Sequence, residues 1–210
     1  MRSALILIGG KARRAEGREK SLFEYKGRTF IEILTSSLRK VTDEIILAAR
    51  DPEQCSRFSF LPGITCVSDI RKGVGPLGGL HAGAKAAHGE YIFVSACDMP
   101  CVNPAIVDYL FGCAEGNDVA VPCHHEKMFE PLHAVYRRDA LIRFLEDPES
   151  RSMREMFPLA RVRYVPVRDL RKFDPDLLTF TNINRMDELE QFRKSGRLDS
   201  SGIKDKKENQ

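Results

Sequence analysis

A pair of glycines followed by a run of basic residues is the first candidate site in the sequence. Gly9 and Gly10 come directly after a short apolar run, and five Lys or Arg residues lie within residues 9–20. Glycines let the backbone approach a ligand closely and turn its amide groups towards it, while Lys and Arg offset several negative charges. This pattern predicts a loop that binds a polyphosphate, with a solvated basic loop as the alternative. The loop is not a Walker motif, because the spacing G-x-x-x-x-G-K is absent.

Two aspartates come directly after later apolar runs and could bind a metal ion. Asp69 follows the run 64–68, and Asp98 follows the run 91–96. Carboxylates in such places suit Mg²⁺, which binds one or two protein carboxylates together with substrate phosphates. Capping of a helix is the alternative for each aspartate, but it suits Asp98 poorly, because the next helix is expected only near Pro104. Together with the basic loop, the two aspartates predict a metal–nucleotide site.

A second glycine-rich segment predicts a different chemistry. Gly73, Gly75 and Gly78 match the dinucleotide fingerprint G-x-G-x-x-G, and Asp98 lies about 20 residues further on. This match would indicate a dinucleotide-dependent oxidoreductase. However, the first glycine does not follow its strand directly, and Pro76 removes one N–H from the turn. The oxidoreductase hypothesis also leaves the basic loop without a role, so it is the weaker alternative.

The elements that position these residues are predicted by the apolar pattern, which alternates between strands and helices. Continuous apolar strands separated by helices are typical of a parallel sheet covered on both faces, where ligands bind beyond the carboxyl ends of the strands. We therefore predict an α/β fold with a single doubly wound, mostly parallel sheet. The expected strands are 4–8, 44–49, 64–68, 91–96, 119–122, 132–136 and 161–167. The expected helices are 30–41, 77–87, 104–113, 138–145, 151–157 and 186–193.

The composition limits the classes of protein to consider. The 210 residues are 42% hydrophobic and 30% charged with a net charge of +3, which is typical of a globular domain. A nucleic-acid-binding module usually has a larger positive excess, and no apolar run approaches the roughly 18–20 residues of a membrane span. We expect one domain over 1–194, with a nucleotide-binding half 3–122 and an acceptor-binding half 123–194. The polar segment 195–210 is expected to be a disordered tail.

The six cysteines form no C-x-x-C pair, and no apolar segment of signal-peptide length opens the sequence. We therefore expect free, mostly buried thiols in a cytoplasmic protein. The adjacent residues Cys123, His124 and His125 could suggest zinc. Neighbouring histidines rarely bind one ion together, so a plain loop is the favoured interpretation.

Four short motifs follow one another along the chain. They are Leu7-Ile8-Gly9-Gly10 with Arg14 and Glu19-Lys20-Ser21-Leu22, then Gly75-Pro76-Leu77-Gly78-Gly79, then Cys97-Asp98-Met99-Pro100, and finally Asn182-Ile183-Asn184. In this order and spacing they resemble the molybdenum cofactor guanylyltransferases. The resemblance covers residues 3–193 and implies a Rossmann-like sheet of the GT-A nucleotidyltransferase type. It also implies transfer of GMP from Mg·GTP to the terminal phosphate of molybdopterin, with release of pyrophosphate.

The resemblance implies a role for each matching residue. The implied nucleotide-binding residues are Leu7, Ile8, Gly9, Gly10, Lys20, Asp69, Gly78 and Asp98. The implied catalytic residues are Lys20, Asp98 and Arg14. The implied ligands of the cofactor Mg²⁺ are Asp98 and Asn184. The implied acceptor-binding residues are Asn182, Asn184, His133 and Arg151.

The same resemblance implies GTP and a phosphorylated pterin as substrates, and molybdenum-insertion or molybdoenzyme-maturation proteins as partners. It implies no nucleic acid and no membrane. Glu16 and Glu19 depart from the family's usual Gly and Asp and place negative charge beside the phosphates. Other acceptors therefore stay open, namely phospholactate, a cobinamide phosphate or a sugar phosphate, with GTP or CTP as donor. A nucleotide sensor without catalytic activity is a further alternative.

Overall fold

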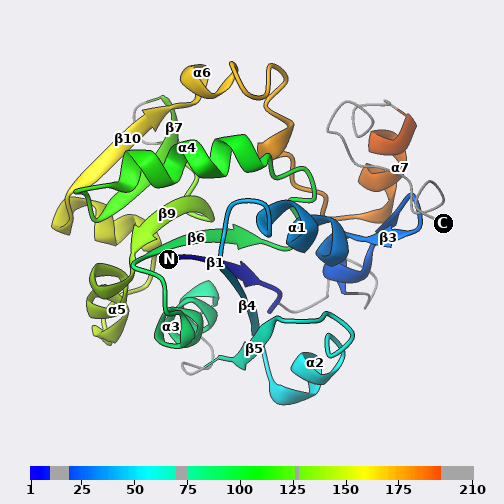
Figure 1. The fold of residues 1–210 in the computed structure, drawn as a ribbon, viewed down its shortest axis with the longest axis horizontal. Coiled ribbons are helices and arrows are strands. Elements are labelled where there is room, and N and C mark those ends of the chain that lie inside the picture. The colour runs from blue at the N-terminus through cyan, green and yellow to red at the C-terminus, as the bar shows by residue number, and fades with distance from the viewer. Residues whose placement is uncertain (10–18, 70–74, 126–127, 195–210) are drawn as a thin grey trace.

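The computed structural model describes residues 1–9, 19–69, 75–125 and 128–194, and its centre is one large sheet (Figure 1). The strands of this sheet are β1 Arg2–Leu7, β4 Glu44–Ala49, β5 Thr65–Ser68, β6 Tyr91–Ala96, β7 Val119–His125, β8 Met128–Phe129, β9 His133–Arg137 and β10 Val162–Pro166. Within the described residues they lie in the order β10-β7-β9-β6-β1-β4-β5, with β8 beside β7. Strand β9 is antiparallel to β6 and β7, and β8 is antiparallel to β7, whereas the other neighbours are parallel.

Helices cover both faces of this sheet, as Figure 1 shows. The α-helices are α1 Phe30–Leu38, α2 Pro52–Ser56, α3 Pro76–Ala86, α4 Pro104–Ala114, α5 Arg138–Glu146, α6 Val167–Leu170 and α7 Met186–Lys194. Shorter elements are the 3₁₀ turns η2 Lys20–Leu22, η3 Met153–Leu159 and η4 Leu178–Phe180, and the hairpin of β2 Glu24–Tyr25 with β3 Arg28–Thr29. The predicted α/β fold with a doubly wound, mostly parallel sheet is therefore confirmed.

Local sequence signals explain where several helices begin. Thr29 caps α1 in a capping box, in which the Glu32 carboxylate accepts from Thr29 N at 2.8 Å. Pro52, Pro76 and Pro104 each lie in the first turn of a helix, where the missing N–H costs no hydrogen bond. These signals account for the agreement between the predicted and observed starts of α1 and α4, and for α3 to within one residue, whereas α2 was not predicted.

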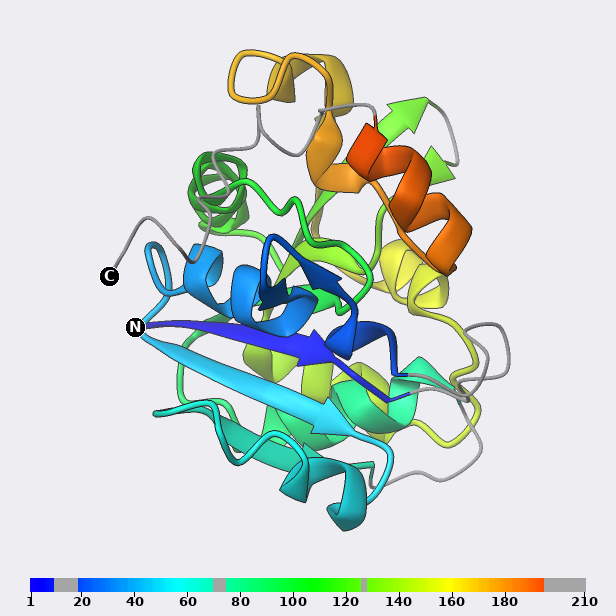
Figure 2. The ribbon, with the colours of Figure 1, turned by 90° about the vertical axis from the view of Figure 1, so that its right-hand side faces the viewer.

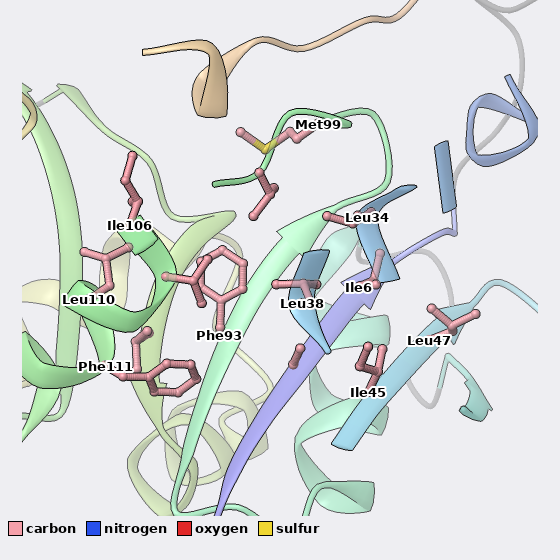
Figure 3. Packing of buried hydrophobic residues seen from close by; sticks show 14 of the residues in the cluster. Ile6, Leu34, Leu38, Ile45, Leu47, Phe93, Met99, Ile106, Leu110 and Phe111 are labelled. Atoms are coloured by element: carbon pink, nitrogen blue, oxygen red, sulfur yellow. The ribbon is translucent and has the colours of Figure 1, made fainter. Parts of the chain in front are cut away.

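Alternate residues of β1 pack into two separate cores. Ile6 lies on the side of α1 and α4, in one cluster with Leu34 and Ile106 (Figure 3). Leu5 lies on the opposite side, in one cluster with Leu80 of α3 and further residues of α5. Burial on both faces explains why the strands are continuous apolar runs in the sequence.

Close packing of α3 on β1 makes a testable prediction about Gly83. A Cβ atom at this position would lie 3.0 Å from Leu5 Cγ and closer still to both of its Cδ atoms. Leu5 is fully buried, so it has no free space into which to move. We expect Gly83→Ala to lower the free energy of unfolding by about 1–3 kcal/mol, measured by denaturant titration.

The matched control is Gly112→Ala, because Gly112 lies in helix α4 and, outside the adjacent backbone of its own helix, no described residue comes within 4 Å of the added Cβ. At this exposed position the higher helix propensity of Ala is expected to stabilise the protein by about 0.5–1 kcal/mol. Equal effects of the two substitutions would contradict the packing argument.

The structure corrects two predicted elements in the C-terminal half. The expected helix 151–157 is the 3₁₀ element η3, which contains Pro158 and begins after the cap Ser152. Proline has no N–H for the α-helical ladder, which explains the difference. The strand expected to end at residue 122 continues to His125, so residues 123–125 are not a plain loop.

The expectation of free thiols is wrong for two of the six cysteines. Cys55 of α2 and Cys66 of β5 form a disulfide, with their Cα atoms 5.7 Å apart. The packing of α2 beside β5 brings them within the usual range for such a bond, although their spacing in the sequence carries no motif. The other cysteines are free thiols: Cys97, Cys101, Cys113 and Cys123.

The predicted tail 195–210 lies outside the described residues. Among the helices of the described segments, none combines the length and the apolar character that crossing a membrane requires.

Candidate active site

Three predicted site residues from distant parts of the chain meet at one point. Lys20 Nζ donates to Asp98 Oδ2 at 3.0 Å and also to Asn184 Oδ1. The side chains of Lys20 and Asp98 are 26% and 17% exposed, so the cluster is accessible but partly shielded from water. A basic side chain in contact with both a carboxylate and an amide oxygen forms a candidate site for a phosphate and a metal ion.

A small hydrophobic cluster beneath the site explains why these three residues meet. Phe23 lies shortly after Lys20 in the chain, Cys101 lies shortly after Asp98, and Ile183 directly precedes Asn184. Phe23, Cys101 and Ile183 all belong to this one buried cluster. The amide of Ile183 also donates to the carbonyl of Asp98 at 2.9 Å, which ties two of the three segments directly.

The cluster lies at the carboxyl edge of the sheet. Strands β1, β4 and β6 are parallel, and Figure 2 shows β1 and β4 running side by side towards the edge where α7 lies. Asp98 follows the end of β6, and Asn184 precedes the start of α7. Asn184 N donates to Glu188 Oε2 at 2.6 Å, so the first turn of α7 holds this residue in place. This is the edge at which parallel α/β sheets bind ligands.

The glycine of the first loop is needed for a reason that the sequence does not reveal. The amides of Ile8 and Gly9 both donate to Ala48 O, at 3.0 and 3.1 Å. A Cβ at Gly9 would lie 3.3 Å from Arg50 N, so only glycine passes the end of β4 without displacement. The expectation that the Gly9 amide points at phosphate is therefore wrong in this arrangement, because β4 already accepts that hydrogen bond.

The other residues predicted around the first loop have different positions. Leu7 and Ile8 are 8% and 5% exposed, and their side chains belong to the two cores on opposite faces of the sheet. Any contact that they make with a nucleotide would therefore come through the backbone. Gly10 and Arg14 lie outside the described residues, so their predicted contacts stay predictions.

Asp69 lies beside a helix whose glycines allow close approach. Gly75 caps α3 with a φ of 63°, which favours glycine. A Cβ at Gly79 would lie 3.0 Å from Asp69 Oδ1, so the absence of a side chain there leaves room for the carboxylate. Gly78 is buried in the same turn. Partial burial raises the pKa of Asp69 to about 6, although Arg50 opposes the shift.

The raised pKa of Asp69 predicts a pH-dependent stability. The native carboxyl binds a proton more tightly than the unfolded one, so its stabilising contribution is present at low pH and is lost as the pH rises through about 6. Asp69→Asn removes this loss. We therefore expect the melting temperature of the variant to rise relative to the unmodified protein between pH 4.5 and pH 7.5.

Asp139→Asn provides a control, because the pKa shift of Asp139 has the opposite sign. Burial raises the pKa of Asp139, but hydrogen bonds from Arg137, Ala140 and Arg143 outweigh burial and leave the pKa lowered. Its contribution to stability is present above the ordinary pKa of 3.8 and is lost only below it, so the effect of Asp139→Asn should stay constant between pH 4.5 and pH 7.5. The same pH trend in both variants would refute the assignment to Asp69.

The predicted acceptor residues are not all at the surface of the site. Asn182 is exposed and lies two residues before Asn184 of the Lys20 cluster. Arg151 is exposed and pairs with Glu149. His133 is fully buried, with Nε2 3.2 Å from Thr179 Oγ1. Burial lowers the pKa of His133 to about 3, so the ring is neutral and offers no charge to an anionic acceptor. His133 packs against Phe93 and Phe180 and has no exposed surface with which to contact an acceptor.

Sequence reasoning missed an open cavity on the same edge of the sheet, at the ends of β7 and β10. Its volume is about 570 Å³, and its walls include Phe129, Tyr164 and Arg168. Phe129 and Tyr164 lie with their ring centres 5.2 Å apart. The aromatic residues are far apart in the sequence, which explains why no local motif predicts this cavity.

The donor set at the Lys20 cluster fits Mg²⁺ better than a softer metal. Asp98 and Asn184 offer one carboxylate and one amide oxygen to the same point, which matches the oxygen ligands of Mg²⁺. Burial raises the pKa of the neighbouring Cys97 to about 12, so its thiol stays protonated at neutral pH. In the described segments no three His, Cys, Asp or Glu side chains gather in a way that could hold a metal ion by themselves.

Comparison with known proteins gives consistent results. Residues 4–164 match the MobA-like NTP transferase domain. A probable molybdenum cofactor guanylyltransferase from Methanosarcina mazei is 41% identical, over 90% of this chain and 88% of the relative. The molybdenum cofactor guanylyltransferase from Desulfosudis oleivorans is 35% identical, over 93% of this chain and 98% of the relative.

A solved structure agrees with these relatives. The crystal structure of molybdopterin-guanine dinucleotide biosynthesis protein A from Archaeoglobus fulgidus has a TM-score of 0.78 and 32% identity to this chain. The match covers 94% of this chain and 100% of that one.

The sheet and the polar cluster at its carboxyl edge define the class of protein, which is a nucleotidyltransferase. Within this class the chain belongs to the family of MobA-like NTP transferases, and the relatives compared above are named molybdenum cofactor guanylyltransferases. The family resemblance found in the sequence is thereby confirmed. The oxidoreductase hypothesis based on Gly73, Gly75 and Gly78 is set aside, because these residues lie within the matched domain.

Proposed function

We propose that this protein transfers GMP from GTP to the terminal phosphate of molybdopterin, forming molybdopterin guanine dinucleotide and pyrophosphate. The observation that carries the proposal is the contact of Lys20 with Asp98 and Asn184 at the carboxyl edge of the sheet. The names of the relatives supply the donor and the acceptor.

The reaction is an in-line displacement at the α-phosphorus of GTP. An oxygen of the acceptor phosphate forms a new bond to that phosphorus, the bond to the β-phosphate oxygen breaks, and the electron pair leaves with pyrophosphate. A phosphate monoester has its second pKa near 6, so the nucleophile is largely ionised at neutral pH and needs no general base. The protein therefore acts by positioning and by offsetting charge.

Lys20 and Asp98 perform these two tasks in the proposal. Lys20 offsets negative charge on the phosphates, while Asp98 and Asn184 would hold Mg²⁺ through their oxygens. When bound there, the ion supplies a Lewis acid that lowers the cost of charge developing on the phosphate oxygens. The backbone bond from Ile183 to Asp98 keeps the two metal-binding side chains in register before a substrate arrives.

Asp69 is suited to recognise the guanine base. It stands at the carboxyl end of β5, beside the glycine-rich start of α3 and at the edge of the sheet where ligands bind. Guanine presents the N2 amino group as a hydrogen-bond donor, which an ionised carboxylate accepts. With a pKa of about 6, Asp69 is mostly ionised at neutral pH and becomes protonated in mild acid.

The acceptor would lie in the half 123–194. The cavity at the ends of β7 and β10 lies at the same edge as Asp98, since β6 and β7 are both antiparallel to β9. Its aromatic walls suit a pterin ring, and Arg168 suits an anionic group. Asn182 and Arg151 are exposed at the surface, Arg151 in an ion pair with Glu149, and both would contribute to acceptor binding. Proteins that insert molybdenum or mature molybdoenzymes would deliver and receive the pterin.

The deciding experiment is a turnover assay with purified protein, Mg·GTP and molybdopterin. We expect pyrophosphate and the guanine dinucleotide to form in equal amounts. Parallel reactions replace GTP by CTP, or molybdopterin by phospholactate, cobinamide phosphate or a sugar phosphate. Faster pyrophosphate release in any of those reactions would overturn the proposed substrates, and binding of Mg·GTP without turnover on any acceptor would favour the nucleotide sensor.

A further inference from the structure

The short helix α2 supports the start of the candidate phosphate loop. Gln54 in this helix is 2% exposed, and its Nε2 donates to Ile8 O at 3.1 Å. Its Oε1 accepts from Arg50 N at 2.8 Å, so both ends of the amide are used. The Ile8 carbonyl carries partial negative charge directly before Gly9, and the Gln54 amide covers it.

The residue that follows α2 supports the other end of the loop. Arg57 Nη1 donates to Glu19 Oε1 at 3.0 Å, and its Nη2 donates to Glu53 Oε1 at 2.8 Å. The Glu19 side chain is 12% exposed, whereas that of Glu53 is 79% exposed. Among the described residues, Glu19 Oε2 has no hydrogen-bond partner. Arg57 therefore compensates a nearly buried carboxylate that directly precedes Lys20.

An uncompensated carboxylate in this place would oppose binding of a triphosphate. Like charges repel most strongly where water is partly excluded, and Glu19 is largely shielded from water. The repulsion would counteract Lys20, the next residue along the chain. Because the Arg57 guanidinium contacts the Glu19 carboxylate, its positive charge largely offsets the repulsion between this carboxylate and the phosphates.

We propose that Arg57 and Gln54 are positioning residues for the nucleotide, because Gln54 of α2 and Arg57 directly after it neutralise the Ile8 carbonyl and the Glu19 carboxylate, the latter next to Lys20. This inference rests on the proposed function, which places the phosphates of GTP beside Lys20. The inference also gives a role to Glu19, which departs from the family pattern. Its carboxylate holds the backbone before Lys20 through the contact with Arg57, and the guanidinium offsets its negative charge.

The test measures the dissociation constant of Mg·GTP by calorimetry, without acceptor, on the full chain. Arg57→Gln is expected to weaken binding about tenfold, because it leaves the Glu19 carboxylate unpaired. Gln54→Leu is expected to weaken binding about three- to tenfold, because the Ile8 carbonyl loses its donor. The matched control Glu53→Gln removes the exposed partner of Arg57 and should bind Mg·GTP within about twofold of the unmodified protein.

A double variant separates this role from simple structural support. Adding Glu19→Gln to Arg57→Gln removes the unpaired charge, so we expect affinity to return to within about threefold of the unmodified protein. A structural role predicts the reverse, since the second substitution removes another contact. In turnover assays, Arg57→Gln should raise KM for GTP and leave KM for the acceptor unchanged, whereas partial unfolding lowers only the amount of active enzyme.

The inference is overturned if Arg57→Gln binds Mg·GTP as tightly as the unmodified protein, or if the double variant binds no better than Arg57→Gln. Melting temperatures without ligand show that each variant is folded at the assay temperature. If the unmodified protein does not bind Mg·GTP, the proposed function itself fails, and that result is distinct from equal binding by all variants.

Discussion

We expect Asp98→Asn to lower the rate of GMP transfer by about 10²–10³-fold, which is the scale observed when one preorganised charged or polar group is removed from an active site. The substitution keeps the shape of the side chain and removes its negative charge. Lys20 would then have no anion opposite it, and one oxygen ligand for Mg²⁺ would be weakened. The measurement is single-turnover release of pyrophosphate at saturating GTP and Mg²⁺.

The control for this prediction is Asp108→Asn. Asp108 also pairs with a basic side chain, at 2.6 Å from Arg2, but it is exposed on α4. We expect the rate of GMP transfer by Asp108→Asn to equal that of the unmodified protein. A rate for Asp98→Asn within about threefold of the unmodified protein would show that Asp98 does not act in the reaction, because loss of a catalytic charge costs far more.

Lys20→Met is the second substitution with a large expected effect. Met retains the length of the side chain but not the ammonium group, which contacts Asp98 and Asn184 in the structure. We expect kcat/KM for GTP to fall about 10²–10³-fold, because charge on the transferring phosphate is no longer offset. Steady-state kinetics with GTP and molybdopterin, together with Mg·GTP calorimetry, separate the loss in binding from the loss in rate.

Lys85→Met is the matched control, because Lys85 also forms an ion pair, at 3.3 Å from Glu146, on the exposed side of α3 and α5. Its kinetics should be unchanged. The double variant Lys20→Met with Asp98→Asn should lose much less than the product of the two single losses, because the residues act as one unit. Fully multiplicative losses would mean that the two side chains act independently, contrary to the contact between them.

The parts of this protein that the sequence predicted are those with a local physical signal. Strands 44–49 and 91–96 were predicted with the observed bounds, because a continuous apolar run indicates a strand that is buried on both faces of the sheet. Pro104 marked the start of α4, since proline suits the first turn of a helix. Asp98 was identified as a site residue because it follows a buried strand, and in a parallel sheet such positions share one edge.

The predictions that were wrong concern residues whose role depends on distant neighbours. The Cys55–Cys66 disulfide forms because α2 packs beside β5, and no spacing rule indicates that packing. His133 matched a family segment, yet its strand places it under Phe93 and Phe180 with no exposed surface. Burial of a single side chain is set by packing of the whole domain, so a sequence motif does not report it.

By itself, the sequence determined the class of fold, the family and the residue types of the site, because apolar periodicity, turn residues and motif order are encoded locally. The tertiary structure alone decided that Lys20, Asp98 and Asn184 touch, since 164 residues separate the first from the last. It also decided that the Gly9 amide is taken by β4 and that Arg57 compensates Glu19. Contacts between side chains distant in sequence follow from how a shared core, here the cluster beneath the site, fixes three separate segments.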